Sequence, residues 1–172
     1  MFPGKSAKIR MVPPADIRPA RPEDCETLHA LVVGLAEYER LAHAVVGSVE
    51  DLRAELFATR PVIEAALAWE SGRAVGFALW FHTYSTFLAR RGLWLEDLFV
   101  VPEARGKGYG KALLKHCAKL AVERGCGRFE WSVLNWNEPS IEFYKAAGAV
   151  LMADWTICRM TGDALERFAA DS

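Results

Sequence analysis

A glycine-rich turn between an apolar strand and a helix is the part of this 172-residue chain that points most directly to chemistry. It reads Arg105-Gly-Lys-Gly-Tyr-Gly110 and follows the apolar run Leu98-Phe-Val-Val101. Alternating glycines leave backbone N–H groups uncovered by side chains, and the positive end of the helix dipole adds to their attraction for an anion. The turn therefore predicts a site for a phosphate or pyrophosphate group.

Spacing excludes the two commonest phosphate loops. A P-loop requires Ser or Thr after Gly-Lys, whereas Gly110-Lys111 is followed by Ala112. The dinucleotide fingerprint places its third glycine three positions after its second, whereas Gly106, Gly108 and Gly110 alternate. The spacing that fits this chain is Arg-x-x-Gly-x-Gly.

That spacing resembles the pyrophosphate loop of the GNAT superfamily of N-acetyltransferases. Further segments resemble its diamine branch, which includes spermidine/spermine-like and thialysine-like enzymes, and the resemblance covers about Asp16 to Ala170. These segments are Leu35-Ala-Glu-Tyr-Glu-Arg-Leu41, Tyr84-Ser-Thr86, Trp94-Leu-Glu-Asp-Leu-Phe-Val100 and Trp136-Asn-Glu-Pro-Ser-Ile-Glu-Phe-Tyr-Lys-Ala-Ala-Gly148. The resemblance implies an α/β (mixed α+β) fold in one domain, with a mostly antiparallel sheet flanked by helices and a strand pair that splays at an acetyl-CoA site.

The resemblance also implies where acetyl-CoA, the co-substrate, would bind. Acetyl-CoA would contact three parts of the chain: the main chain of the strand before the loop, the loop itself, and the start of a later helix. The residues so assigned are Leu98, Phe99, Val100, Arg105, Gly106, Lys107, Gly108, Tyr109, Gly110, Lys111, Asn137, Ser140 and Tyr144. Without the resemblance, Asn137 and Ser140 would be expected to cap a helix, and Tyr144 to pack in the core with its hydroxyl at the rim.

Two adjacent carboxylates, Glu96 and Asp97, interrupt an otherwise apolar strand. Burying them costs several kcal/mol, about 2–7 per polar group, unless each is paired or solvated. Strand alternation places them on opposite faces unless a bulge intervenes, and a salt-bridged pair at the edge of the core is one interpretation. The resemblance implies instead that Glu96 is a catalytic carboxylate acting through water. It also implies that the amine substrate lies near Tyr38, Glu39, Glu96 and Asp97.

The chemistry expected is direct acetyl transfer to a neutral amine, and the resemblance implies that Tyr144 protonates the departing thiolate. A free alkyl amine has a pKa of about 10, so an ordinary carboxylate is a weak direct base for it. No acyl-enzyme is expected, because Cys117 lies on the apolar face of a predicted helix and Cys126 is also poorly placed for a nucleophile.

One loop departs from the polyamine-specific enzymes, which carry an acidic, Trp-containing loop after Tyr-Ser-Thr. Here that loop reads Phe87-Leu-Ala-Arg-Arg-Gly92. Two arginines would repel a long polycation or pair with a substrate carboxylate. A short diamine or a lysine-like ω-amino acid is therefore the expected substrate. Acetylation of protein or peptide amines and a non-catalytic CoA sensor are the alternatives.

The composition of the chain argues against several other classes of protein. The net charge is −1 with 25% charged residues, which does not indicate nucleic-acid binding, and no apolar run is long enough to span a membrane. Residues 1–15 contain three prolines and no periodic pattern, so we expect a disordered tail before a domain over residues 16–170. The four cysteines form no Cys-x-x-Cys pair and the four histidines no His-Glu-x-x-His pattern. We therefore expect reduced thiols, no metal site and a cytoplasmic location.

The resemblance also implies that the protein is a homodimer.

Periodicity and turn signals predict alternating strands and helices along the whole domain. A capping box at Ser48-Val-Glu-Asp51 marks the start of the second helix. Strands are expected over 16–20, 62–69, 74–84, 93–101 and 129–134, with one bent or two short strands within 149–160. Helices are expected from Pro22 to about Leu41, from Ser48 to about Arg60, and over 108–124, 139–147 and 162–169.

Overall fold

The computed structural model describes residues 16–170 and divides the chain into two compact units that meet between Ser132 and Val133. The predicted tail, residues 1–15, lies outside the described residues. The first unit contains a five-stranded sheet in the order β1-β2-β3-β4-β5. Its strands are β1 (Asp16–Pro19), β2 (Glu64–Glu70), β3 (Arg73–Ser85), β4 (Arg90–Val100) and β5 (Arg128–Trp131). The first four strands pair antiparallel and β4 pairs parallel with β5, which confirms the predicted mixed fold.

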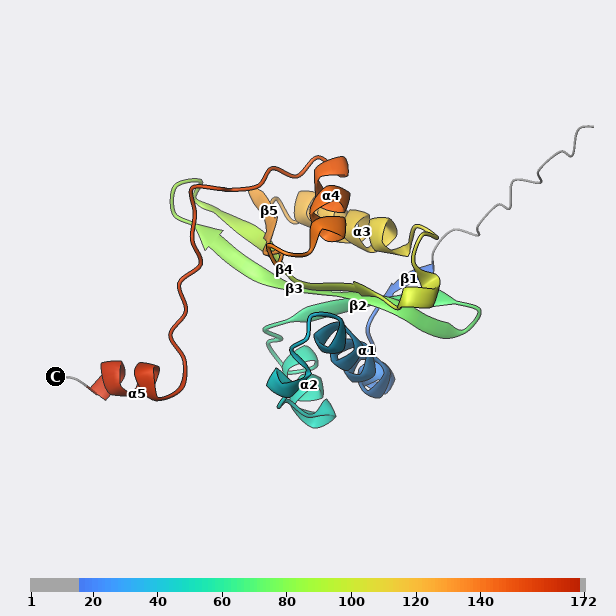
Figure 1. Ribbon diagram of the computed structural model, residues 1–172, viewed down its shortest axis with the longest axis horizontal. Coiled ribbons are helices and arrows are strands. Elements are labelled where there is room, and N and C mark those ends of the chain that lie inside the picture. The colour runs from blue at the N-terminus through green and yellow to red at the C-terminus, as the bar shows by residue number, and fades with distance from the viewer. Residues whose placement is uncertain (1–15, 171–172) are drawn as a thin grey trace, which may run out of the picture. The chain divides into compact units, whose positions relative to one another are not determined.

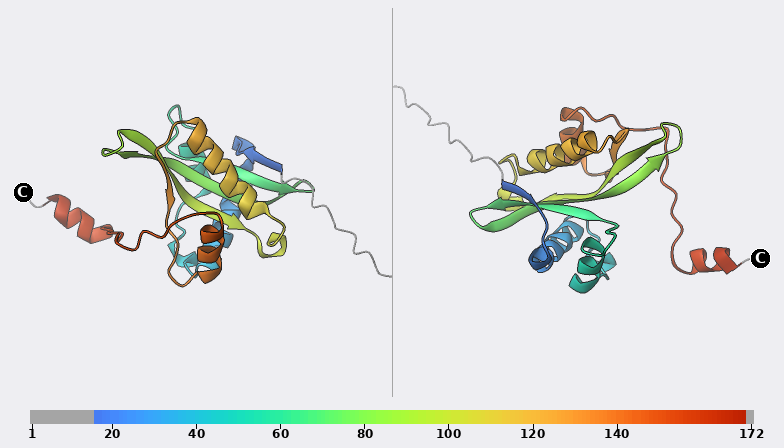
Figure 2. Two further views of the ribbon diagram at one scale, coloured as in Figure 1. Left: turned by 90° about the horizontal axis from the view of Figure 1, so that it is seen from above. Right: turned by 180° about the vertical axis from the view of Figure 1, so that it is seen from behind.

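Two layers of helices enclose this sheet. Helices α1 (Cys25–Tyr38) and α2 (Val49–Leu56) cover one face, and α3 (Tyr109–Glu123) covers the other (Figures 1 and 2). Short 3-10 turns occur at Pro22–Asp24, Ala42–Ala44 and Pro102–Ala104. The helices begin and end within a few residues of their predicted bounds, although α1 ends three residues before Leu41 and α2 four before Arg60.

Local sequence signals account for several of these boundaries. The Ser48 hydroxyl accepts a hydrogen bond from the Asp51 N–H at 3.1 Å, and the Asp51 carboxylate accepts one from the Ser48 N–H at 2.8 Å. This is the predicted capping box, and it starts α2. The β2–β3 hairpin turns through Ser71 and Gly72, whose φ angles of 51° and 80° suit a tight turn between twisted strands.

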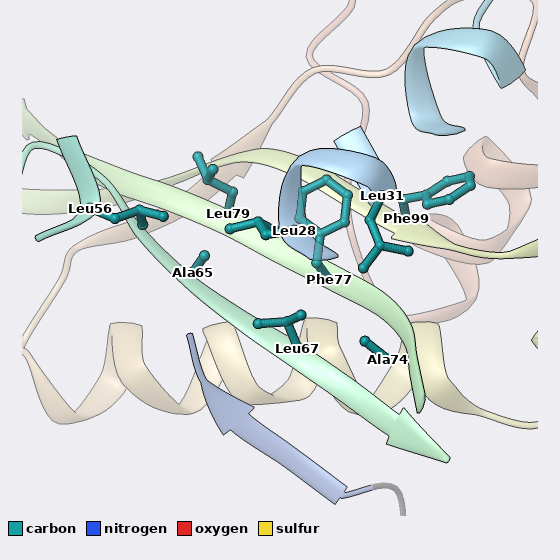
Figure 3. Close-up of a cluster of buried hydrophobic side chains, with 9 residues drawn as sticks. All are labelled: Leu28, Leu31, Leu56, Ala65, Leu67, Ala74, Phe77, Leu79 and Phe99. Atoms are coloured by element: carbon teal, nitrogen blue, oxygen red, sulfur yellow. The ribbon is translucent and has the colours of Figure 1, made fainter. Parts of the chain in front are cut away.

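The core under α1 and α2 explains how the first unit is held together. Nine buried side chains from both helices and three strands pack there (Figure 3), and Phe77 at its centre is fully buried. They are Leu28, Leu31, Leu56, Ala65, Leu67, Ala74, Phe77, Leu79 and Phe99. Burying one such leucine or phenylalanine contributes about 1.5–3 kcal/mol, so this layer fixes α1 against β4.

The second unit contains α4 (Glu138–Ala146) and α5 (Gly162–Ala170). The prediction of strands within 149–160 is wrong, because the backbone there forms no strand. A strand requires a hydrogen-bonded partner as well as apolar residues, and none pairs with this segment among the described residues. The expectation of one domain over 16–170 remains a prediction.

Candidate active site

The glycine turn forms the start of α3, as predicted. Gly106 and Gly108 have φ angles of 75° and 90°, a region that costs glycine nothing and strains other residues. Gly108 is the N-cap residue, and no side chain among the described residues caps it. The first-turn N–H groups of α3 therefore remain open to an anion.

Two basic side chains of the turn contact protein groups. Arg105 donates from Nε to the Val100 carbonyl at 3.0 Å, and its guanidinium lies 4.5 Å from the centre of the Tyr38 ring. Lys107 donates from Nζ to both carboxylate oxygens of Glu70, at 3.0 and 3.1 Å. The turn is thus connected to the end of α1 through Arg105 and to β2 through Lys107.

A bulge in β4 determines where the two adjacent carboxylates point. Leu95 pairs with Trp80 and Asp97 with Leu79, so Glu96 is the extra residue. Because directly paired residues share a face of the sheet, Asp97 lies on the face of Leu79, which α1 and α2 cover. Without the bulge, Asp97 would share a face with Leu95. The sequence alone left this choice open.

The same bulge redirects the backbone of β4. Val101 donates its N–H to Val75 in β3 at 3.0 Å, whereas the Val100 carbonyl faces Arg105. Since successive residues of an antiparallel strand direct their polar groups to opposite sides, Leu98 and Val100 face away from β3 and Phe99 faces towards it. Of the three residues assigned to acetyl-CoA by their main chains, Leu98 and Val100 are thus the two that face outward.

That outward side of β4 is an open edge beyond Leu95. Strand β5 pairs only with residues 92–95, and among residues 16–170 no other strand pairs on this side. The pairing of β4 with β5 thus ends at Leu95, and the splay of this strand pair remains a prediction. An open strand edge next to an uncapped helix start fits a long polar arm that carries phosphates, and these are the residues that could hold acetyl-CoA.

Three carboxylates gather where α1 ends above the bulge. Gly34 brings α1 close to β4, because a Cβ on it would lie 3.3 Å from the Phe99 ring. Burial raises the pKa of Asp97 to about 7, and the neighbouring charges of Glu96 and Glu39 add to the rise. Burial also raises the pKa of Glu39. Among the described residues, no hydrogen bond or ion pair engages Asp97.

Glu96 is in a different environment although it adjoins Asp97 in the chain. Its side chain is exposed and accepts a hydrogen bond from the Trp94 indole N–H at 2.9 Å. Asp97 differs from Glu96 in being half-buried, and its burial disfavours the charged form of the carboxylate. The structure thus brings Glu39, Glu96 and Asp97 together, with the Glu96 side chain exposed and the Asp97 side chain half-buried.

The other predicted site residues lie in the second unit, on α4. The Asn137 side chain accepts from the Ser140 N–H at 3.4 Å and so caps α4, as its local sequence suggests. Tyr144 lies in the same helix with its ring centre 5.2 Å from that of Phe143. Their assignment to acetyl-CoA and to thiolate protonation remains a prediction.

Cysteine and metal chemistry receive no support from the described residues. All four cysteines are free, and burial raises the pKa of Cys117 to about 12. A thiol with such a pKa is almost entirely protonated at neutral pH and is a poor nucleophile. Among residues 16–170, no three His, Cys, Asp or Glu side chains group so as to hold a metal ion. None of the described helices is long and apolar enough to cross a membrane.

Sequence reasoning missed Glu70 as part of this site. It is an ordinary strand-end glutamate, 37 residues before the lysine that it binds, and no local signal connects the two. The stacking of Arg105 on Tyr38 was also missed, since the loop pattern assigns this arginine to phosphate.

The candidate site combines an uncapped glycine turn, a bulged strand with an open edge and a cluster of carboxylates. The profile of the acetyltransferase (GNAT) family matches residues 32–149. The chain is 35% identical to a thialysine N-epsilon-acetyltransferase of Mus musculus over 164 residues, covering 89% of this chain and 96% of the relative. It is 33% identical to an L-ornithine N5-acetyltransferase of Arabidopsis thaliana, covering 87% and 86%.

Among solved structures, an integron cassette protein of V. cholerae has a TM-score of 0.77 at 27% identity, covering 91% of this chain and 98% of that one. The protein therefore belongs to the acetyltransferase (GNAT) family, in its diamine-like branch. It is an acetyl-CoA-dependent N-acetyltransferase.

Proposed function

We propose that this enzyme acetylates the terminal amine of a small lysine-like ω-amino acid or short diamine by direct attack within a ternary complex. The observation that carries the proposal is the cluster of Glu39, Glu96 and Asp97 beside the open edge of β4. Opposite charge attracts an ammonium to this cluster, and the open edge is the place proposed for the thioester arm. The amine and the acetyl group would then meet at the bulge.

The three carboxylates have two roles in this proposal, which are to bind the ammonium group and to accept its proton. Glu39, Glu96 and Asp97 attract the ammonium group, and Glu96 is the carboxylate proposed to accept the ammonium proton through a water molecule. Asp97 supports this role as a second proton acceptor, because a pKa of about 7 is closer to that of an amine than the pKa of an ordinary carboxylate. The nitrogen forms a bond to the acetyl carbon, the carbon–sulfur bond breaks, and the Tyr144 hydroxyl protonates the thiolate.

Substrate length follows from the distance between the acidic cluster and the arginine loop. Arg90 pairs with Ser85 and Asp97 with Leu79, so the two residues are six steps apart along β3 and share a face of the sheet. At about 3.3 Å per residue this is roughly 20 Å, longer than an extended lysine side chain. Within one chain, Arg90 would therefore discourage the approach of long polycations, while a shorter ω-amino acid binds at the cluster.

The names of the relatives favour the ω-amino acid over the polyamine. Thialysine and ornithine, named for two of the relatives at 33–35% identity, each carry one terminal amine and one carboxylate. The spermidine/spermine-like relative is 29% identical and matches over 23% of its own length. We also propose a homodimer in the cytoplasm, for which light scattering after gel filtration should give twice the 19.1 kDa chain mass.

The test is thiol release from acetyl-CoA with thialysine, ornithine, lysine, putrescine, spermidine, spermine and a mixed peptide set. We expect the highest kcat/KM with one of the short ω-amino acids or putrescine. Spermine as the best substrate would contradict the charge argument. Turnover with the peptides alone would indicate that the enzyme acetylates protein amines. Binding of acetyl-CoA without turnover of any amine would indicate a CoA sensor.

A further inference from the structure

Glu70, at the end of β2, connects the phosphate-binding turn to the neighbouring hairpin. Its carboxylate accepts from Lys107 Nζ at 3.0 and 3.1 Å and from the Tyr109 hydroxyl at 3.0 Å. Close by, across the same hairpin, Arg73 pairs with Glu103 at 2.9 Å. One carboxylate thus holds both the basic side chain of the turn and the first residue of α3.

The two contacts of Glu70 differ in how easily they can change. Tyr109 is only 3% exposed, so its hydroxyl keeps Glu70 in place. Lys107 is 40% exposed in its side chain and has a flexible four-carbon stem, so its ammonium can move to another partner. The hydrogen bond from Lys107 holds the pKa of Glu70 below its usual value, so the carboxylate is ionised at neutral pH.

We propose that Glu70 competes with the phosphates of the co-substrate for Lys107 and so weakens the binding of acetyl-CoA and eases the release of CoA. In this proposal Lys107, which donates to Glu70 in the structure, changes to a phosphate oxygen when acetyl-CoA binds. Glu70 then remains beside the turn, held by the Tyr109 hydroxyl, and accepts Lys107 again when the phosphates leave. This inference rests on the proposed phosphate site at residues 105–111.

The expected size of the effect is modest. An exposed Lys–carboxylate pair of this kind is equivalent to at most about a fivefold factor in a dissociation constant. We therefore expect Glu70→Gln to bind acetyl-CoA and CoA about two- to fivefold more tightly. The variant keeps an oxygen that can accept from Tyr109, so the start of α3 retains its contact. Its affinity should also fall more steeply with salt, because Lys107 is then free to pair with phosphate.

Titration calorimetry with acetyl-CoA and with CoA, in the absence of any amine, measures this without turnover. The matched control is Glu103→Gln. It also removes one carboxylate charge near the turn, but that carboxylate pairs with Arg73, so the contact between Lys107 and Glu70 stays intact. We expect its affinity to change less than that of Glu70→Gln. In a Lys107→Met background, Glu70→Gln should lose most of its gain.

Three results would overturn the proposal. They are unchanged or weaker binding by Glu70→Gln, an equal gain in Glu103→Gln, and a full gain that persists in Lys107→Met. In each of these cases the wild type still binds acetyl-CoA, so the proposed function stands. Absence of acetyl-CoA binding by the wild-type protein would instead refute the phosphate site itself, and this inference with it.

Discussion

Asp97→Asn should make the protein more stable at alkaline pH while reducing its activity. The pKa of Asp97 is raised from 3.8 to about 7, mainly by burial. At about 1.36 kcal/mol per pKa unit, the ionised carboxylate destabilises the folded state by up to about 4 kcal/mol once the pH is well above 7. The folded state binds this proton more tightly than the unfolded state, so stability falls as the pH rises from about 4 towards 7 and then levels off. Asparagine carries no charge and lacks this dependence.

Urea denaturation followed by tryptophan fluorescence at about pH 5 and about pH 8.5 measures the effect. Between these two values the stability of Asp97→Asn relative to wild type should rise by about 1–3 kcal/mol, since the half-buried group is partly relaxed by solvent. This corresponds to roughly 2–4 °C in Tm per kcal/mol. The kcat/KM for the amine should fall at least about tenfold, because one of the three carboxylates that attract the ammonium, which is also the second proton acceptor, is gone.

Asp24→Asn is the matched control, because the same loss of a carboxylate charge should lower the stability of the protein at alkaline pH instead of raising it. Asp24 is buried, pairs with Arg18 at 2.6 Å and accepts from the Arg21 N–H at 2.8 Å. The hydrogen bond from Arg18 lowers the pKa of Asp24, so its contribution to stability is present above the unfolded pKa and is lost as the pH falls. A gain for Asp97→Asn that is independent of pH, or a loss at alkaline pH, would refute the reasoning about Asp97.

Three further variants, the last with a matched control, test other parts of the account. Tyr144→Phe should lower kcat by about 10–100-fold with an unchanged unfolding midpoint, and an unchanged kcat would reduce Tyr144 to a packing residue. The double variant Cys117→Ala with Cys126→Ala should keep its turnover, with a loss of stability of about 1–2 kcal/mol, and complete inactivity would contradict direct transfer. Gly76→Ala should lose about 1–3 kcal/mol or more in thermal unfolding, because its Cβ would lie 2.6 Å from a carbonyl oxygen of β4. Gly47→Ala has no atom within 4 Å of its Cβ and should be nearly neutral.

The parts of the fold that depend on local interactions could be predicted from sequence. The Ser48 capping box, the Ser71–Gly72 hairpin and the glycine turn before α3 lie at their predicted positions. Each is determined by residues within a few positions of one another. The segment 149–160 could not be predicted in the same way, because a strand depends on a partner that its own sequence does not specify.

Within the candidate site, the residue types could be predicted but not their environments. Alternation could not show that the extra residue of the bulge is Glu96, which places Asp97 under α1 with a raised pKa. That outcome depends on the register between β3 and β4. The contact of Glu70 with Lys107 likewise depends on which strand end meets the turn in space.

The most direct test of the central claim is the pH profile of kcat/KM for the best short amine. If the carboxylate cluster binds the ammonium and Asp97 takes up its proton, the value should rise tenfold per pH unit up to about 7. It should then level off until the amine itself loses its proton near a pKa of about 10. In Asp97→Asn the inflection near 7 should disappear. A wild-type value that keeps climbing tenfold per unit through about pH 9 would mean that only free amine from solution binds, and would contradict the account.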